Sequence, residues 1–152
     1  MTNVHNRIQV MHGVNLDVLG RRNPEIYGDL SFNELERRVS DMAAELGLQT
    51  RFFQSNFEGE FVEELHRLDG LADGVLLNPG AWTHYAWAIR DALEIADLPA
   101  VEVHLSDVEA REEWRKLSVF DGLVLSKVFG KGPDGYREAL ELLARELGAG
   151  PS

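Results

Sequence analysis

A tyrosine and two arginines lie close together in a glycine-rich segment near the start of the chain. The segment, residues 12–28, reads HGVNLDVLGRRNPEIYG and also holds the amide side chain of Asn15. A guanidinium group beside a phenol favours the ionised phenolate, which can act as a base. Arg21 or Arg22 could therefore prepare Tyr27 for proton abstraction. The alternative is a surface loop in which the tyrosine is packed and the arginines are solvated.

A glutamate and a histidine alternate with apolar residues in the segment VEVHL, residues 101–105. Because successive side chains of a strand point to opposite faces, Glu102 and His104 share one face. A carboxylate two residues from an imidazole can fix its tautomer and stabilise its charged form, as a general acid requires. A polar pair on a strand that should be buried therefore indicates function. A satisfied structural pair is the alternative.

Further polar side chains follow other apolar runs. Asn78 ends the run GVLLN, where an amide can face a ligand, and Thr83 can cap a helix that opens at His84. That histidine is either a hydrogen-bond partner at the helix start or a catalytic group. Arg111 and Arg115 stand four residues apart, so one helical turn would present both on one side, unless they only pair with neighbouring glutamates. Together these residue types suit acid–base chemistry on a small anion.

Apolar runs that predict strands alternate with helical patterns along the chain. Strands are expected at 8–11, 48–54, 74–78, 100–105 and 123–129, and helices at 32–46, 59–68, 84–96 and 135–147. Ser31 and Glu34 have the spacing of a capping box that starts the first helix. Residues 12–30 are expected to form a long loop, and residues 107–117 a short helix or loop.

The alternation of strands and helices predicts an α/β fold. We expect a flavodoxin-like three-layer sandwich with a five-stranded parallel sheet, formed by a single domain over residues 1–152. Residues 16–30, here called the lid loop, could close over a ligand, and the tail at 148–152 is expected to be loose. Such sheets bind ligands beyond the carboxyl ends of their strands, so the candidate residues should gather at one sheet edge.

Charge and composition exclude several classes of function. The chain has 15 Lys and Arg against 26 Asp and Glu, and its net charge of −11 argues against binding nucleic acid or an anionic membrane. The absence of cysteine excludes disulfides, thiolate metal sites and cysteine nucleophiles. No apolar run approaches the length of a membrane span, and residues 1–7 do not resemble a signal peptide. We therefore expect a cytoplasmic protein.

A series of sequence blocks resembles the type II 3-dehydroquinate dehydratases (type II dehydroquinases) over nearly the whole chain. In order, the blocks are NLDVLGRRNPEIYG, QSNFEG, NPGAWTH, IRDAL, EVHLS, AREEWR and GYREAL. The resemblance implies a flavodoxin-like subunit, a homo-oligomer assembled as a dodecamer of trimers, and no cofactor, neither a metal nor a lysine Schiff base. It also implies anti elimination of water from 3-dehydroquinate to 3-dehydroshikimate through an enolate, in the shikimate or quinate pathway.

The resemblance implies roles for individual residues as well. Tyr27 matches the tyrosinate base that takes the C2 proton, and Arg22 matches the group that stabilises that phenolate. Asn15 matches a residue that helps to hold a water molecule at the enolate oxygen. His104 matches the acid that protonates the departing C1 hydroxyl, and Glu102 matches the residue that orients this histidine.

The remaining matched positions are expected to bind the substrate. They are Asn78 for the end that carries the C1 hydroxyl, Leu105 and Ser106 for the carboxylate, His84 and Arg115 for the ring hydroxyls, Arg111 for the shape of the site, and Asp91 for the site of a neighbouring subunit.

A few positions depart from the family pattern. The family usually has NGPN where this chain has HGVN at residues 12–15, and the other departures are Asn23 for glutamate, Phe57 for histidine, Asp107 for asparagine and Glu109 for histidine. Loss of the proline at Val14 is expected to loosen the turn that carries Asn15. The alternatives are a related lyase that acts on another hydroxylated cyclic carboxylate and a non-catalytic flavodoxin-like binding module.

Overall fold

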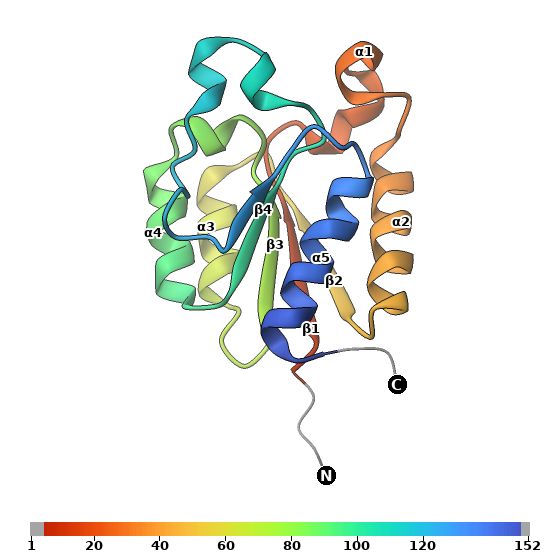
Figure 1. Cartoon of the computed structure of the whole chain (residues 1–152). Helices are drawn as coiled ribbons and strands as arrows, with labels where there is room; N and C mark the ends of the chain where they lie inside the picture. Colours follow the sequence, from red (N-terminus) through yellow and green to blue (C-terminus); the bar gives the residue numbers. More distant parts are fainter. Residues whose placement is uncertain (1–4, 150–152) are drawn as a thin grey trace.

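The strands form one fully parallel sheet. The structure, a computed structural model, describes residues 5–149. Its strands are β1 (Arg7–His12), β2 (Gln49–Gln54), β3 (Gly74–Asn78), β4 (Ala100–Val103) and β5 (Ser126–Val128). They pair in the order β2-β1-β3-β4-β5. This arrangement confirms the predicted flavodoxin-like α/β fold with a five-stranded parallel sheet (Figure 1).

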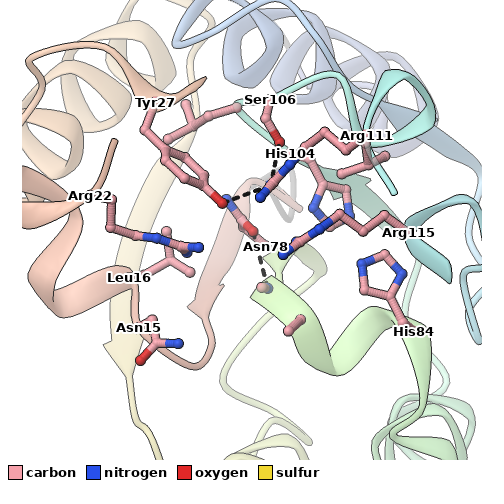
Figure 2. Close-up of a pocket in the computed structure, with 14 residues that line it drawn as sticks. Asn15, Leu16, Arg22, Tyr27, Asn78, His84, His104, Ser106, Arg111 and Arg115 are labelled. Atoms are coloured by element: carbon pink, nitrogen blue, oxygen red, sulfur yellow. Dashed lines mark hydrogen bonds between the residues drawn. The ribbon is translucent and has the colours of Figure 1, made fainter. Parts of the chain in front are cut away.

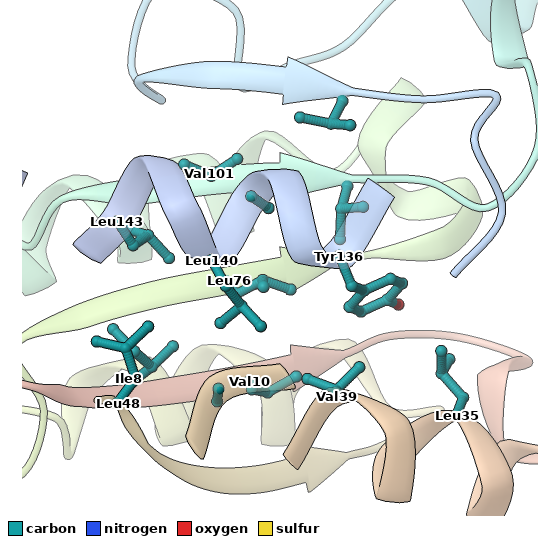
Figure 3. Close-up of a cluster of buried hydrophobic side chains, with 14 of the residues drawn as sticks. Ile8, Val10, Leu35, Val39, Leu48, Leu76, Val101, Tyr136, Leu140 and Leu143 are labelled. Carbon is teal, nitrogen blue, oxygen red and sulfur yellow. The ribbon is translucent and has the colours of Figure 1, made fainter. Parts of the chain in front are cut away.

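Helices cover both faces of the sheet. Figure 1 shows α2 (Phe32–Glu45) and α5 (Asp134–Leu147) on one face, and α3 (Glu58–His66) and α4 (Trp87–Ala96) on the other. Alternate strand residues supply the two cores, because strand side chains alternate between faces. Val10 and Leu76 pack in the cluster under α2 and α5, which Figure 3 shows, whereas Met11 and Leu77 pack in the cluster under α3 and α4.

The segment before α2 is more ordered than a long loop. It contains a 3₁₀ turn, η1 (Leu16–Arg21), and one turn of helix, α1 (Pro24–Tyr27). Asn23 accepts a hydrogen bond from the N–H of Glu25 at 3.0 Å, and Pro24 occupies the first helical turn. An asparagine cap followed by proline is a helix-start signal, so residues 12–30 are not the continuous long loop that was expected.

The segment after β3 also differs from expectation. Residues Gly80–His84 form a 3₁₀ turn, η2, and α4 begins only at Trp87. Thr83 does not cap a helix, since its hydroxyl donates instead to the Glu102 carboxylate in the next strand. A partner that is distant in sequence therefore replaces the expected local cap.

Several other element ends shift. Residues 107–117 form two 3₁₀ turns, η3 (Val108–Ala110) and η4 (Glu113–Lys116). β5 starts later than predicted because Leu123 lies in a turn, with its N–H donating to the Phe120 carbonyl at 2.9 Å. Half of the capping box forms. Ser31 accepts from the N–H of Glu34 at 3.2 Å, but the Glu34 carboxylate pairs with Arg38.

The end of the chain is partly described. The N–H of Ala149 donates to the Ala144 carbonyl at 2.9 Å, so the first residues of the expected loose tail close α5. The rest of that expectation, at 150–152, lies outside the described residues. Within residues 5–149, no helix combines the length and the apolar character needed to cross a membrane.

Two loops at the carboxyl edge of the sheet press directly against each other. A Cβ atom on Gly13, just after β1, would lie 2.2 Å from the carbonyl oxygen of Pro79, just after β3. We expect Gly13→Ala to lower the free energy of unfolding by about 2 kcal/mol, because two backbone segments must separate. Gly59→Ala is the matched control, since Gly59 lies in α3 with open space around it. Equal urea midpoints for the two variants would contradict the prediction.

Candidate active site

A pocket lies at the carboxyl edge of the sheet, where most of the predicted residues meet (Figure 2). Its volume is about 630 Å³ including space open to solvent, within the usual range for small-molecule sites. The predicted residues that line it are Asn15, Arg22, Tyr27, Asn78, His84, His104, Leu105, Ser106, Arg111 and Arg115, and Leu16, Gly80, Ala81 and Val108 complete the wall. Glu102 lies behind the wall against His104, whereas Asp91 is exposed on α4 outside the pocket.

Glu102 is fully buried in β4 and is surrounded by hydrogen-bond donors. The Nε2 atom of His104 lies 2.5 Å from Oε2, the Ser118 hydroxyl donates to Oε1 at 2.6 Å, and the Thr83 hydroxyl donates to Oε2. Burial acts to raise the pKa of Glu102, but these hydrogen bonds outweigh it and hold the pKa below its usual value. The ionised carboxylate binds Nε2 and so fixes the orientation of the imidazole, which leaves Nδ1 of His104 for a ligand.

Neither Thr83 nor Ser118 was identified as a site residue from the sequence. Thr83 has the local appearance of a helix cap, and Ser118 lies among residues with no motif. Their common feature is contact with the buried carboxylate. The only signal in the sequence was the physical requirement that a buried polar pair, Glu102 and His104, have hydrogen-bond partners.

Two arginines contact Tyr27 in different ways. Arg111 Nη1 donates to the phenol oxygen at 2.8 Å and also reaches the Ser106 hydroxyl at 3.5 Å (Figure 2). Arg22 instead lies over the face of the ring, with its Cζ atom 4.1 Å from the centroid. The group at the phenol oxygen is therefore Arg111, whereas Arg22, which was expected to stabilise the phenolate, makes a cation–π contact with the ring. Both contacts place a guanidinium group against the phenol of Tyr27.

Arg111 and Arg115 reach the pocket from separate turns. Arg111 follows η3 and Arg115 lies in η4, so the expectation that one helical turn presents both was wrong. The alternative of a glutamate network is also present, because Arg115 donates to Glu112. Trp114, which sequence reasoning missed, stacks under Arg115 with 4.2 Å between Cζ and the ring centroid.

His84 is held as a neutral imidazole. Its Nδ1 lies 2.7 Å from the Leu117 carbonyl, which can only accept, so Nδ1 carries the hydrogen. Burial lowers the pKa of His84 and outweighs the opposing effect of that hydrogen bond. Nε2 is then an acceptor, which suits contact with a ligand hydroxyl. The ring of Trp114 packs edge to face with His84 at a centroid distance of 5.0 Å.

Asn15 lines the pocket although no proline precedes it. Its backbone is left-handed, with φ of 71°, and its N–H donates to Oδ1 of Asn56 at 2.8 Å. Asn56 also donates to Asp17 at 3.1 Å. These side-chain contacts hold the turn that was expected to be loose at Val14.

The loop after β4 is supported from the glycine turn that follows β5. The carbonyl oxygens of Ser106 and Leu105 accept from the N–H groups of Gly130 and Gly132, at 3.0 and 3.1 Å. Asp107, a departure from the family pattern, caps η3 by accepting from the N–H groups of Glu109 and Ala110. Its carboxylate is therefore occupied as a hydrogen-bond acceptor for backbone N–H groups.

The pocket differs in charge from the chain as a whole. Among the described residues that line it there are three arginines and two histidines and no carboxylate, in a protein of net charge −11. Such a local excess of positive charge attracts a small anion. With a phenol and an imidazole facing the same space, the pocket can take a proton at one position and give one at another.

The chain is similar to known proteins over most of its length. The family model described as "Dehydroquinase class II" matches residues 6–144. A 3-dehydroquinate dehydratase of Thermotoga neapolitana is 45% identical over 139 residues, which cover 91% of this chain and 94% of that protein. The fold is similar to that of a type II dehydroquinase structure from Propionibacterium acnes, with 39% sequence identity, a TM-score of 0.87 and coverage of 95% of this chain and 99% of that one. It is also similar to a type II dehydroquinase structure from Butyrivibrio crossotus, with 35% sequence identity, a TM-score of 0.88 and coverage of 91% of this chain and 97% of that one.

The hydrogen bonds around Glu102 make a pH-dependent prediction. A carboxyl group whose pKa is lowered by folding stabilises the folded state above its unfolded pKa, and this contribution disappears as the pH falls through the folded pKa. Ser118→Ala removes a donor to Glu102 and also the acceptor of the Phe120 N–H, so we expect a loss of about 2 kcal/mol in urea unfolding at pH 7 that becomes smaller, without vanishing, once Glu102 is protonated.

Ser31→Ala is the control for this experiment, because it removes a neutral helix cap worth about 1 kcal/mol. Its effect should be similar at both pH values. A Ser118→Ala effect that is also the same at neutral and acid pH would contradict the assignment of Ser118 to the ionised carboxylate.

Proposed function

The chain belongs to the class II dehydroquinase family, and from this premise we propose that the pocket removes water from 3-dehydroquinate to give 3-dehydroshikimate, as a lyase of the shikimate or quinate pathway. The observation that carries the proposal is the placement of two acid–base groups in one pocket. One is Tyr27 with Arg111 at its phenol oxygen, and the other is His104 with Glu102 behind it.

Proton abstraction is assigned to Tyr27. As a phenolate stabilised by Arg111 and Arg22, it takes the proton from C2 of the substrate, next to the ketone. The electron pair of the C–H bond moves towards the ketone oxygen, which becomes an enolate. We place Asn15 at this oxygen, where its side chain in the pocket wall can help to hold a water molecule that donates to the negative charge.

Departure of water is assigned to His104. The enolate electrons re-form the ketone and break the C1–O bond, while the imidazolium gives its proton to the leaving hydroxyl, so water is released and a C=C bond forms. Tyr27 then holds the proton taken from C2, and return of one proton from Tyr27 to His104 through solvent restores both groups. Glu102 stabilises the imidazolium before transfer and keeps Nδ1 directed to the substrate.

The rest of the pocket can orient the substrate. Ser106 and the backbone of Leu105 are proposed to hold the carboxylate, at the loop that the glycine turn supports. His84 and Arg115 are proposed to contact the ring hydroxyls, with Nε2 of the neutral His84 as acceptor. Arg111 serves the base directly in this arrangement, in addition to shaping the site.

A direct test is the ultraviolet absorbance of the purified protein mixed with 3-dehydroquinate. The product is a conjugated enone and the substrate is not, so turnover raises the absorbance. Tyr27→Phe is expected to lower kcat by at least about 10³-fold, since it removes the base. Tyr85→Phe is the matched control, because Tyr85 is 58% exposed and outside the pocket. Full activity of Tyr27→Phe would reject this base, and no turnover by the wild type would reject the substrate.

We also propose that the protein is a dodecamer built from trimers, in which Asp91 reaches the active site of a neighbouring subunit. Asp91 is exposed on α4, the helix that also carries the exposed Trp87, which would be available for subunit contact. Light scattering should give the mass of a dodecamer of the 17.1 kDa chain. Asp91→Ala should keep that mass and lower kcat/KM about tenfold. A monomeric, fully active protein would contradict the proposal. The cytoplasmic location stays a prediction.

A further inference from the structure

Behind Asn78 lies a buried chain of hydrogen bonds that the proposed mechanism does not use. Asn78 Nδ2 donates to the Tyr136 hydroxyl at 3.0 Å, and Nε2 of His12 lies 2.9 Å from the same oxygen. Tyr136 on α5 and His12 at the end of β1 have no exposed surface, and neither lines the pocket. Figure 3 shows the Tyr136 ring within the core under α5.

The surroundings of Asn78 determine which end of its amide faces which partner. The backbone N–H of Gly80 lies 3.2 Å from the side-chain oxygen (Figure 2), and a backbone N–H can only donate. The atom next to Gly80 is therefore the oxygen, and the atom next to Tyr136 is the nitrogen. One hydrogen of that nitrogen is used by Tyr136, and the second is free for a group in the pocket.

His12 completes this series of hydrogen bonds as an acceptor. Since the Tyr136 oxygen accepts from Asn78, its own hydrogen can be donated to Nε2 of His12. Burial lowers the pKa of His12 to about 3, so the imidazole is neutral and has a lone pair to offer. Its hydrogen is then on Nδ1, which has no hydrogen-bond partner among residues 5–149.

This series of hydrogen bonds has a free-energy cost that packing of the core alone would not require. A buried N–H without a partner costs about 1–3 kcal/mol, and phenylalanine at 136 with an aliphatic residue at 12 would avoid it. His12 and Tyr136 do not line the pocket, and among the described residues that do, Asn78 alone is hydrogen-bonded to this pair.

We propose that His12 and Tyr136 are positioning residues that lock the Asn78 amide so that its free N–H faces the leaving C1 hydroxyl. This inference rests on the proposed function. A fixed donor at the leaving oxygen stabilises the charge that develops as the C–O bond breaks, which complements proton transfer from His104. It acts in the transition state more than in the bound substrate, so it should affect kcat more than KM.

The test is a double-mutant cycle on kcat for 3-dehydroquinate. Tyr136→Phe and His12→Leu are each expected to lower kcat about tenfold, with KM changed less than about twofold. His12→Gln keeps an acceptor near the Nε2 position and should retain most of the wild-type kcat. In an Asn78→Ala background, Tyr136→Phe should cause no further loss, because the residue it positions is gone. Leu143→Val, on α5 and outside this series of hydrogen bonds, controls for loss of core packing.

Independent losses from Tyr136→Phe and Asn78→Ala, multiplying in the double variant, would overturn the proposal. If His12→Leu does not fold, Tyr136→Phe still decides, since it only removes a hydroxyl. Failure of the proposed function would be seen separately, as no turnover by the wild type. In that case a crystal structure of the ligand-free Tyr136→Phe variant tests the positioning proposal. A rotated Asn78 amide supports the proposal, and an unchanged amide overturns it.

Discussion

A carboxylate with no exposed surface stays ionised only when hydrogen-bond donors replace water around it, and Glu102 imposes this condition on the sheet edge. Its donors come from three places: His104 directly after β4, Thr83 in η2 and Ser118 after η4. Satisfying one buried charge therefore draws three segments together, and the wall of the pocket that carries the imidazole is built from them. The orientation of the proposed acid follows from the electrostatics of the strand behind it.

The two halves of the proposed chemistry rest on different kinds of support. The acid side is anchored in the sheet, where Glu102 is buried in β4. The base side is carried by short turns above the sheet, since Tyr27 ends α1 and Arg111 follows η3. Direct contact between the guanidinium and the phenol joins these turns across the pocket. The arginines also give a protein of net charge −11 a local cationic site.

The parts that depend on local pattern were predictable from the sequence. Apolar runs predicted all five strands, their alternation with helical patterns predicted the flavodoxin-like parallel sheet, and spacing placed Glu102 and His104 on one face. What could not be predicted were side-chain partners far apart in the chain. Thr83 has every local property of a cap, yet a buried carboxylate competes for its hydroxyl. Arg22 is near Tyr27 in sequence, yet Arg111 binds the phenol oxygen. Tyr136 resembles any core aromatic residue until its hydroxyl is placed.

The hydrogen bond between His12 and Tyr136 joins residues that are 124 positions apart, from the first strand to the last helix. A ribosome exposes β1 and β3, and with them His12 and Asn78, long before α5 leaves the exit tunnel. Until that helix docks, the imidazole and the amide lack the phenol that connects them. The finished active site therefore requires α5, and a nascent chain that lacks this helix holds the pocket residues but cannot assemble this connection.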